Sequence, residues 1–142
     1  MKRLLQLFIV FLVGSQLPTY AQVVSITTLG STYSQDFDSL ASSGTANTSL
    51  PYGWYFSETS GNTTYAADYG SLNSGNTYSY GATGSSDRAL GGLQSGSNTP
   101  TIGAAFTNNT GSAISAIEIQ FVVEHWRLGA TGRIDTSRFE MS

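Results

Sequence analysis

Short segments of alternating apolar and polar residues make up most of this 142-residue chain. Gly, Asn and Ser separate these segments at intervals of roughly ten residues, the rhythm of a β-sandwich or barrel. Alternation with a period of two indicates a strand with one buried face, whereas an amphipathic helix needs a period of 3.6. No such helical period is present after residue 21. The pattern therefore predicts an all-β protein built as an antiparallel sandwich.

The punctuation divides the chain into eight expected strands. They cover residues 23–29, 33–37, 53–57, 64–69, 77–81, 88–93, 101–107 and 116–128. Residues 40–50, "LASSGTANTSL", are rich in Ser, Thr, Gly and Asn and are expected to form a surface loop.

The clearest alternation lies in "AIEIQFVVEHW", where Ile117, Ile119, Phe121 and Val123 occupy every second position. The preceding "FTNNTGSAIS" contains Asn and Gly, which tolerate the left-handed backbone of a tight reversal. We expect Phe106 and Ile117 to lie on neighbouring antiparallel strands.

The last residues resume the alternation, with Ile134, Phe139 and Met141 at the apolar positions. No turn signal follows before Ser142, and an unpaired sheet edge is a feature that natural proteins avoid. We therefore expect the module to be incomplete at its C-terminus, with further strands beyond Ser142.

The first 21 residues have the pattern of a secretory signal peptide. Lys2 and Arg3 precede an apolar run over residues 4–13, and Ala21 ends a short polar region. The apolar run is far shorter than the roughly 20 residues that span a bilayer. We predict cleavage after Ala21, export by the general secretory pathway, a secreted or outer-surface bacterial protein with no membrane span, and a single module over residues 22–142.

The charge of the chain limits its classes of binding partner, and its lack of cysteine limits what can hold the fold together. Removal of Lys2 and Arg3 with the leader changes the formal net charge from −3 to −5 and leaves no lysine. Such an acidic chain lacks the basic surface that binds phosphate backbones, so nucleic acid is not an expected partner. Cysteine is absent, so the exported fold must be held by packing and hydrogen bonds alone.

Two candidate catalytic patterns are weak. Glu118 and Glu124 flank Gln120 in a near miss of the acidic motif of laminarinase-like glycoside hydrolases. Six strand positions separate the two carboxylates by about 20 Å, whereas glycosidase pairs are about 5–10 Å apart. His125 is the only histidine, and no local nucleophile motif accompanies it. We expect this segment to have no catalytic residues.

Aromatic residues offer a possible glycan surface, because flat rings stack on sugar faces. The candidates occur in "PYGWYF", "TTYAADYG" and "TYSYG", and they are Trp54, Tyr65, Tyr69, Tyr78 and Tyr80. The alternative is structural, since tyrosine is common on half-exposed strand faces.

Asp36 and Asp38 flank Phe37 and would place two carboxylates on one strand face. A structural Ca²⁺ would suit them, although calcium needs six or more oxygen ligands. No other cofactor is expected.

Near the C-terminus, Trp126 is expected to fill the core or cover a sheet edge. Arg127 is expected to pair with a carboxylate such as Asp87 or Glu124.

Several stretches together resemble a known module: "YSQDFDSL", "LPYGWYFSE", "GNTYSYGATGSSDRALGGLQSGS", "IGAAFTNNTGSAISAIEIQFVVEHWRLG" and "DTSRFEMS". They are similar to the N-terminal module of large secreted proteins from Bacteroidota and planctomycetes. Asp87 and Arg88 match its Asp-Arg-Ala-Leu-Gly pattern, and Glu124, Trp126 and Arg127 match its Glu-Gln-Trp-Arg pattern, with His125 in place of Gln.

The resemblance implies a lectin-like β-sandwich of the jelly-roll or concanavalin A type. It also implies a surface protein sorted by a type IX or exosortase system, often with lamin-tail or hydrolase domains downstream. The module itself has no defined activity.

Three functions remain open from the sequence. The first is a non-catalytic module that contacts polysaccharide or another surface protein in adhesion. The second is the N-terminal accessory region of an extracellular nuclease, phosphatase or glycosidase whose catalytic domain lies downstream. The third is a structural spacer, which burial of the aromatic pairs would favour.

Overall fold

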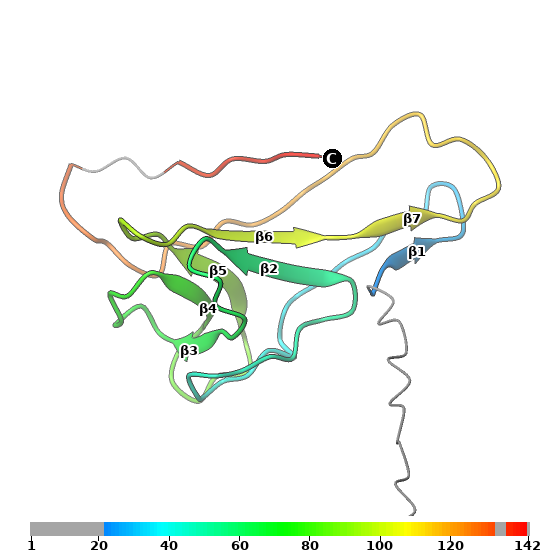
Figure 1. The fold of residues 1–142 in the computed structure, drawn as a ribbon. Coiled ribbons are helices and arrows are strands. Elements are labelled where there is room, and N and C mark those ends of the chain that lie inside the picture. The colour runs from blue at the N-terminus through cyan, green and yellow to red at the C-terminus, as the bar shows by residue number, and fades with distance from the viewer. Residues whose placement is uncertain (1–21, 133–135, 142) are drawn as a thin grey trace, which may run out of the picture.

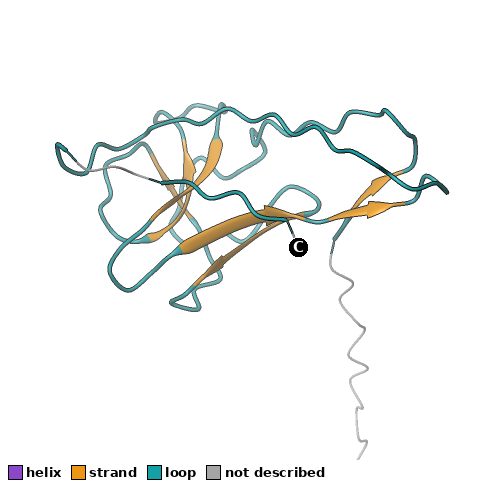
Figure 2. Cartoon of the chain, turned by 90° about the horizontal axis from the view of Figure 1, so that it is seen from above, coloured by secondary structure: helices purple, strands orange, loops and turns teal. Residues whose placement is uncertain are grey.

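The computed structural model describes residues 22–132 and 136–141; the predicted leader over residues 1–21 lies outside them. The described chain contains strands and loops, with no residue in a helix (Figure 2). In this part of the chain no helix is long and apolar enough to cross a membrane. Seven strands occur, namely β1 (Val24–Ile26), β2 (Trp54–Glu58), β3 (Ala66–Asp68), β4 (Asn76–Tyr80), β5 (Ala89–Leu93), β6 (Pro100–Ala104) and β7 (Phe106–Asn108).

The strands form three small sheets, with orders β3-β4-β5, β2-β6 and β1-β7. The pairs β2-β6 and β4-β5 are antiparallel, as expected for a sandwich. The pairs β1-β7 and β3-β4 are parallel, so the prediction of a purely antiparallel arrangement is wrong. Figure 1 shows the β2-β6 pair above the β3-β4-β5 sheet. The all-β architecture is confirmed, and its several sheets are consistent with a β-sandwich.

The core lies on the β3-β4-β5 sheet, where β4 is the central strand. Tyr78 and Tyr80 are buried there beside Ala66, and their ring centroids are 5.2 Å apart. Gly91 of β5 makes room for the Tyr80 ring, since a Cβ at this position would lie 2.9 Å from Tyr80 Cδ2. The first glycine of "ALGGL" thus admits the Tyr80 ring, and the second, Gly92, allows the close approach of Pro100, 2.7 Å from where a Cβ of Gly92 would lie.

Most of the expected strands are present with shorter bounds. The predictions over 23–29, 53–57, 64–69, 77–81 and 88–93 correspond to β1, β2, β3, β4 and β5. The prediction over 101–107 is divided at Ala105 into β6 and β7. Residues 40–50 form a loop apart from an isolated antiparallel bridge at Asn47.

The strand expected over residues 33–37 is absent; these residues form a loop that leads into a turn closed by a hydrogen bond from the Leu40 N–H to the Phe37 carbonyl oxygen at 2.9 Å. Asp36 Oδ1 accepts a hydrogen bond from the Asp38 backbone N–H at 3.1 Å, and Phe37 adopts φ = 68°. Phe37 also packs edge-on against Trp54, with ring centroids 4.6 Å apart. Local turn chemistry and ring packing therefore override the alternation here.

The strand expected over residues 116–128 is also absent, although this was the clearest pattern in the sequence. The segment runs back from β7 without pairing to any described strand (Figure 1). Phe121 is 68 % exposed, and Ile117 is equally open. Phe106 pairs in parallel with Val24, so the expected Phe106–Ile117 pairing is wrong. Alternation measures strand propensity, and a strand also needs a hydrogen-bonded neighbour.

The same segment contacts the core at one point near its end. Trp126 stacks on Tyr80 with ring centroids 6.2 Å apart and an interplanar angle of 6°. Arg127 Nη1 donates to the carbonyl oxygens of Gly70 and Ser71 at 3.3 and 3.1 Å. Trp126 thus packs against the core, as expected. The hydrogen bonds described for Arg127 are to these two carbonyl oxygens, and its expected pairing with a carboxylate stays a prediction. Farther on, the alternation at Phe139 and Met141 forms no strand among the described residues 136–141.

Candidate functional site

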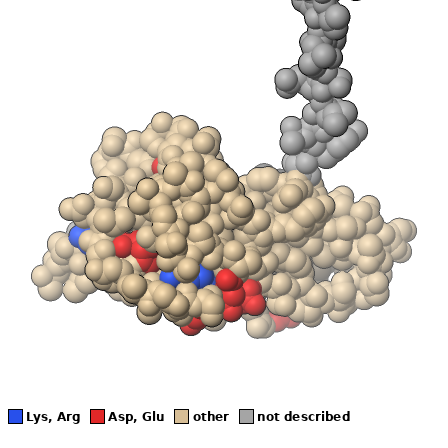
Figure 3. Space-filling view, turned by 90° about the horizontal axis from the view of Figure 1, so that it is seen from below, with Lys and Arg blue, Asp and Glu red and all other residues tan. Residues whose placement is uncertain are grey.

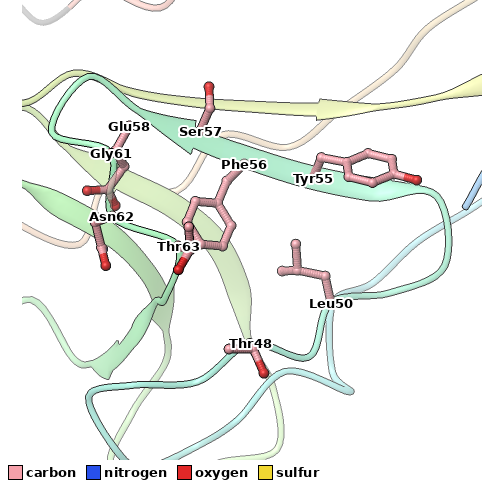
Figure 4. A pocket seen from close by; sticks show the side chains of 9 residues that line it. All are labelled: Thr48, Leu50, Tyr55, Phe56, Ser57, Glu58, Gly61, Asn62 and Thr63. Atoms are coloured by element: carbon pink, nitrogen blue, oxygen red, sulfur yellow. The ribbon is translucent and has the colours of Figure 1, made fainter. Parts of the chain in front are cut away.

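An open cleft of about 320 Å³ lies beside β2 and the loops on either side of it. Figure 4 shows the side chains of Leu50 and Phe56 directed into this space, whereas Ser57 points away from it. The nine lining residues combine aromatic, aliphatic, hydroxyl and amide groups and are Thr48, Leu50, Tyr55, Phe56, Ser57, Glu58, Gly61, Asn62 and Thr63.

Side chains alternate between the two faces of β2, and this alternation decides which of them are buried. Phe56 is half-buried and Glu58 is buried, while Tyr55 and Ser57 between them are exposed. The Phe56 ring is anchored from below by an edge contact with Tyr65, with ring centroids 6.4 Å apart. An aromatic side chain held in this way presents a fixed apolar surface to the cleft.

A turn after β2 forms the other wall of the cleft. Gly61 has φ = 77°, a left-handed conformation that glycine adopts without strain. Asn62 Oδ1 accepts a hydrogen bond from the Thr64 backbone N–H at 3.2 Å, and Asn62 Nδ2 donates to Asn76 Oδ1 at 2.8 Å. Both bonds fix the Asn62 side chain, so the wall is rigid before any ligand binds.

Glu58 is the one carboxylate among the nine lining residues, and its oxygens are already bonded. Oε1 accepts from the Thr77 backbone N–H at 2.6 Å, and Oε2 accepts from Asn98 Nδ2 at 2.6 Å and Ser60 Oγ at 3.1 Å. Burial raises the pKa of Glu58, but the bonds from Thr77 and Asn98 outweigh it, and the pKa lies below its ordinary 4.5. Glu58 is thus held ionised as part of the scaffold between the two layers.

The cleft has the chemistry of a binding surface. Glycoside hydrolysis by the common route uses two carboxyl groups, one of which must be able to hold a proton. Among the lining residues only Glu58 has a carboxyl group, and its hydrogen bonds favour the ionised form. The ring of Phe56 and the hydroxyls of Thr48 and Thr63 suit stacking and hydrogen bonding to a neutral polar ligand, with Tyr55 at the rim of the cleft.

The aromatic residues predicted from the sequence lie mostly in the scaffold. Tyr65, Tyr78 and Tyr80 are buried, and Tyr65 Oη bonds the Ser49 carbonyl oxygen at 2.8 Å. Trp54 is half-buried, and its Nε1 donates to Tyr33 Oη at 2.9 Å. Tyr69 is exposed, so it does not share an environment with Tyr65.

The residues that line the cleft are not among those predicted from the sequence. Tyr55, Phe56 and Leu50 lie in or next to the quoted "PYGWYF" stretch, from which only Trp54 was selected. Period-two alternation within this stretch separates Tyr55 from its neighbours and was the available signal. The contribution of the loop residues Thr48 and Thr63 has no local signature, because the tertiary fold brings them together.

The predicted calcium ligands Asp36 and Asp38 lie in the turn before β2. Asp36 Oδ1 accepts from the Asp38 backbone, and Asp38 Oδ1 accepts from the Arg88 backbone N–H at 3.2 Å. Within residues 22–132 and 136–141, no group of three or more His, Cys, Asp or Glu side chains is placed to hold a metal ion. The calcium prediction therefore stays a prediction.

The residues matched to the module pattern lie in two places. Arg88 is buried, and Asp87 beside it is exposed in the loop before β5. Glu124 is exposed and accepts a hydrogen bond from Trp126 Nε1 at 2.7 Å. Glu118 and His125 are also exposed in the extended segment, outside any described strand.

Comparison with models of protein families, with characterised proteins and with solved structures finds no match. The resemblance to the surface-protein module therefore stays a prediction from the motifs.

Proposed function

We propose that this protein is a secreted or cell-surface β-sandwich module, of the jelly-roll or concanavalin A type, that contacts polysaccharide through the cleft beside β2 and has no catalytic activity of its own. The observation that carries the proposal is the lining of this cleft, in which Tyr55 and Phe56 lie beside threonine hydroxyls and the fixed amide of Asn62. Pockets that combine apolar rings with a few placed polar groups are typical of small-molecule and sugar sites.

The sparse charge of the surface supports a neutral glycan as the ligand. On the face shown in Figure 3, most of the few charged side chains lie along the lower part, and nearly all of the rest is uncharged. A neutral polysaccharide loses no counterions on binding, so its affinity should depend little on salt. A strongly charged partner would behave in the opposite way.

The test is a binding screen of the full chain against a panel of neutral polysaccharides, followed by calorimetry on the tightest binder. Tyr55→Ala and Thr63→Ala should each weaken binding, Tyr55→Ala by roughly tenfold, the loss expected when an aromatic contact of about 1.4 kcal/mol is removed. Tyr52→Ala is the matched control, since Tyr52 is exposed nearby but does not line the cleft. Equal affinity in all three variants would contradict the proposal.

A second candidate is a purely structural spacer. It is favoured by the burial of Tyr65, Tyr78 and Tyr80, which removes three of the five aromatic residues first considered for ligand binding. The same screen separates the two candidates, because a spacer binds no member of the panel while folding normally.

A further inference from the structure

A second, smaller pocket of about 180 Å³ lies away from the cleft, where the loop before β5 meets β3. None of its lining residues is shared with the cleft, and they come from three stretches of the chain. The polar groups among them belong to Ser42, Asp68, Tyr69, Thr83 and Arg88. The proposed polysaccharide contact at the β2 cleft uses none of these residues.

Arg88 is the feature that most needs explanation, because it is only 3 % exposed and carries a charge. A guanidinium has five N–H donors. Nε donates to Ser79 Oγ at 2.9 Å, Nη2 donates to the Ser79 carbonyl oxygen, and Nη1 donates to the Ala82 carbonyl oxygen at 3.4 Å. One N–H on each terminal nitrogen is left without an acceptor among the described residues.

The fold makes room for this guanidinium but gives it no counterion. A Cβ on Gly81 would overlap Arg88 Nη1, so glycine at this position is what admits the side chain. No carboxylate of the described chain forms an ion pair with Arg88; the described ion pair is that of Arg138 with Glu140. Asp38 accepts from the Arg88 backbone N–H rather than from its side chain. A buried charge without a counterion is costly, and binding of an anion would offset that cost.

Asp68 lines the same pocket, but its own turn already satisfies its carboxylate. Oδ2 accepts from the backbone N–H groups of Gly70 and Leu72 at 2.9 and 3.1 Å, and Oδ1 accepts from Ser71 Oγ at 2.8 Å. Burial raises the pKa of Asp68, but the bonds from Ser71, Leu72 and Gly70 outweigh it, so the carboxylate stays ionised and is held by its own turn. The pocket therefore contains a guanidinium without a described ion pair, beside hydroxyl groups and a carboxylate whose own turn supplies its hydrogen-bond donors.

We propose that this pocket binds the carboxylate group of an acidic sugar, a uronic acid residue, with Arg88 as the group that recognises the charge. A planar carboxylate matches the two free N–H groups on the terminal nitrogens of a guanidinium. Ser42 and Thr83 supply hydroxyls for the sugar, and Tyr69, which is 59 % exposed, supplies a ring at the entrance. The inference is independent of the β2 cleft, since the two pockets share no residue.

The experiment is a titration of the ¹⁵N-labelled full chain with two matched ligands, methyl galacturonoside and methyl galactoside. They differ in whether carbon 6 is a carboxylate or a hydroxymethyl group. The Arg88 Nε–H resonance and the amide signals of residues 81–88 should shift with galacturonoside and stay in place with galactoside. Absence of any shift with galacturonoside at millimolar concentration would overturn the proposal.

Variants and a third ligand sharpen the result. Arg88→Lys keeps the positive charge but loses the paired N–H donors of the planar guanidinium. It should therefore weaken galacturonoside binding at least tenfold. Tyr69→Ala and Thr83→Val should weaken it less, and Thr45→Val, in the loop that carries Ser42 but outside the pocket, should leave it unchanged. If Arg88→Lys does not fold, the Arg88 resonance of the unmodified chain decides. Acetate binding as tightly as galacturonoside would overturn the sugar part of the proposal.

The test is separable from that of the β2 cleft. Tyr55→Ala should leave galacturonoside binding intact, and Tyr69→Ala should leave neutral polysaccharide binding intact. Loss of both activities in either single variant of normal stability would contradict the assignment of two sites.

Discussion

Strands β2 and β4 have the same length and similar aromatic content, yet they play opposite parts in the molecule. In β4, Tyr78 and Tyr80 are 1 % and 7 % exposed because hydrogen-bonded neighbours flank the strand on both sides. In β2, which pairs with β6 alone, Tyr55 is 37 % exposed on the strand face opposite to Phe56 and Glu58. What covers each face of a strand, rather than the composition of the strand, decides whether its rings are buried in the core or exposed.

Replacing one aromatic residue in each strand should give the largest difference in the free energy of unfolding. Tyr78→Ala should lower the free energy of unfolding by about 3–5 kcal/mol, because it leaves a cavity in the core and removes the 2.8 Å bond from Tyr78 Oη to the Ser74 carbonyl oxygen. Tyr55→Ala should cost about 1 kcal/mol or less, as is usual for exposed positions. Urea denaturation of both variants measures the difference, and equal losses would refute the division of roles.

The next largest effect on stability is expected at Glu58, the β2 carboxylate that bonds the Thr77 backbone of β4. Glu58→Gln should destabilise the protein by about 2–3 kcal/mol at pH 7, since it removes charged hydrogen bonds to Thr77 and Asn98. The folded pKa of Glu58 is depressed, so its contribution is complete above about pH 4.5 and is lost as the pH falls below that value. Urea midpoints between pH 3 and 7 should therefore converge for the two proteins at low pH. Glu118→Gln, at an exposed position, is the control and should show no such convergence.

Gly70 tests the contact between the core and the extended segment. It has φ = 93°, and a Cβ there would overlap the carbonyl oxygen of Trp126. Gly70→Ala should cost about 1–2 kcal/mol of backbone strain and detach Trp126 from Tyr80, which red-shifts tryptophan fluorescence. Gly61→Ala shares the positive φ but has open space around it, so it should show the strain without the fluorescence change. The same spectra for both variants would show that the Trp126 contact is not formed.

The smallest expected effect concerns Thr77, whose buried Oγ1 has no hydrogen-bond partner among the described residues. Thr77→Val replaces this hydroxyl by a methyl group of similar size. We expect stability to stay within about 1 kcal/mol, because removal of a poorly bonded buried hydroxyl is offset by the loss of its interaction with Glu58, whose pKa the Thr77 side chain helps to lower. A clear loss in a thermal melt would mean that the hydroxyl is bonded in solution.

The sequence predicted most of the strands but not how they pair. Period-two alternation located β2, β4 and β5, and glycine punctuation separated them. The same alternation wrongly predicted a strand at Phe121, because no pattern within a segment specifies its hydrogen-bonded neighbour.

The candidate sites show the same limit. Composition identified aromatic residues as the natural material of a glycan surface, but it selected Tyr65 and Tyr78, which the fold buries. Arg88 was noted as part of a motif, yet its burial without a counterion depends on Gly81 and on the course of a loop. Burial and convergence are tertiary properties, so neither site could be located before the fold was known.

The most direct measurement of the central claim is an amide chemical-shift map of the full chain with fragments of the polysaccharide that binds it most tightly. The account predicts that shifts concentrate in residues 48–63, around the β2 cleft, while the amides of β4 stay in place. Shifts that centre on β4, or saturating binding that leaves residues 48–63 unperturbed, would contradict it.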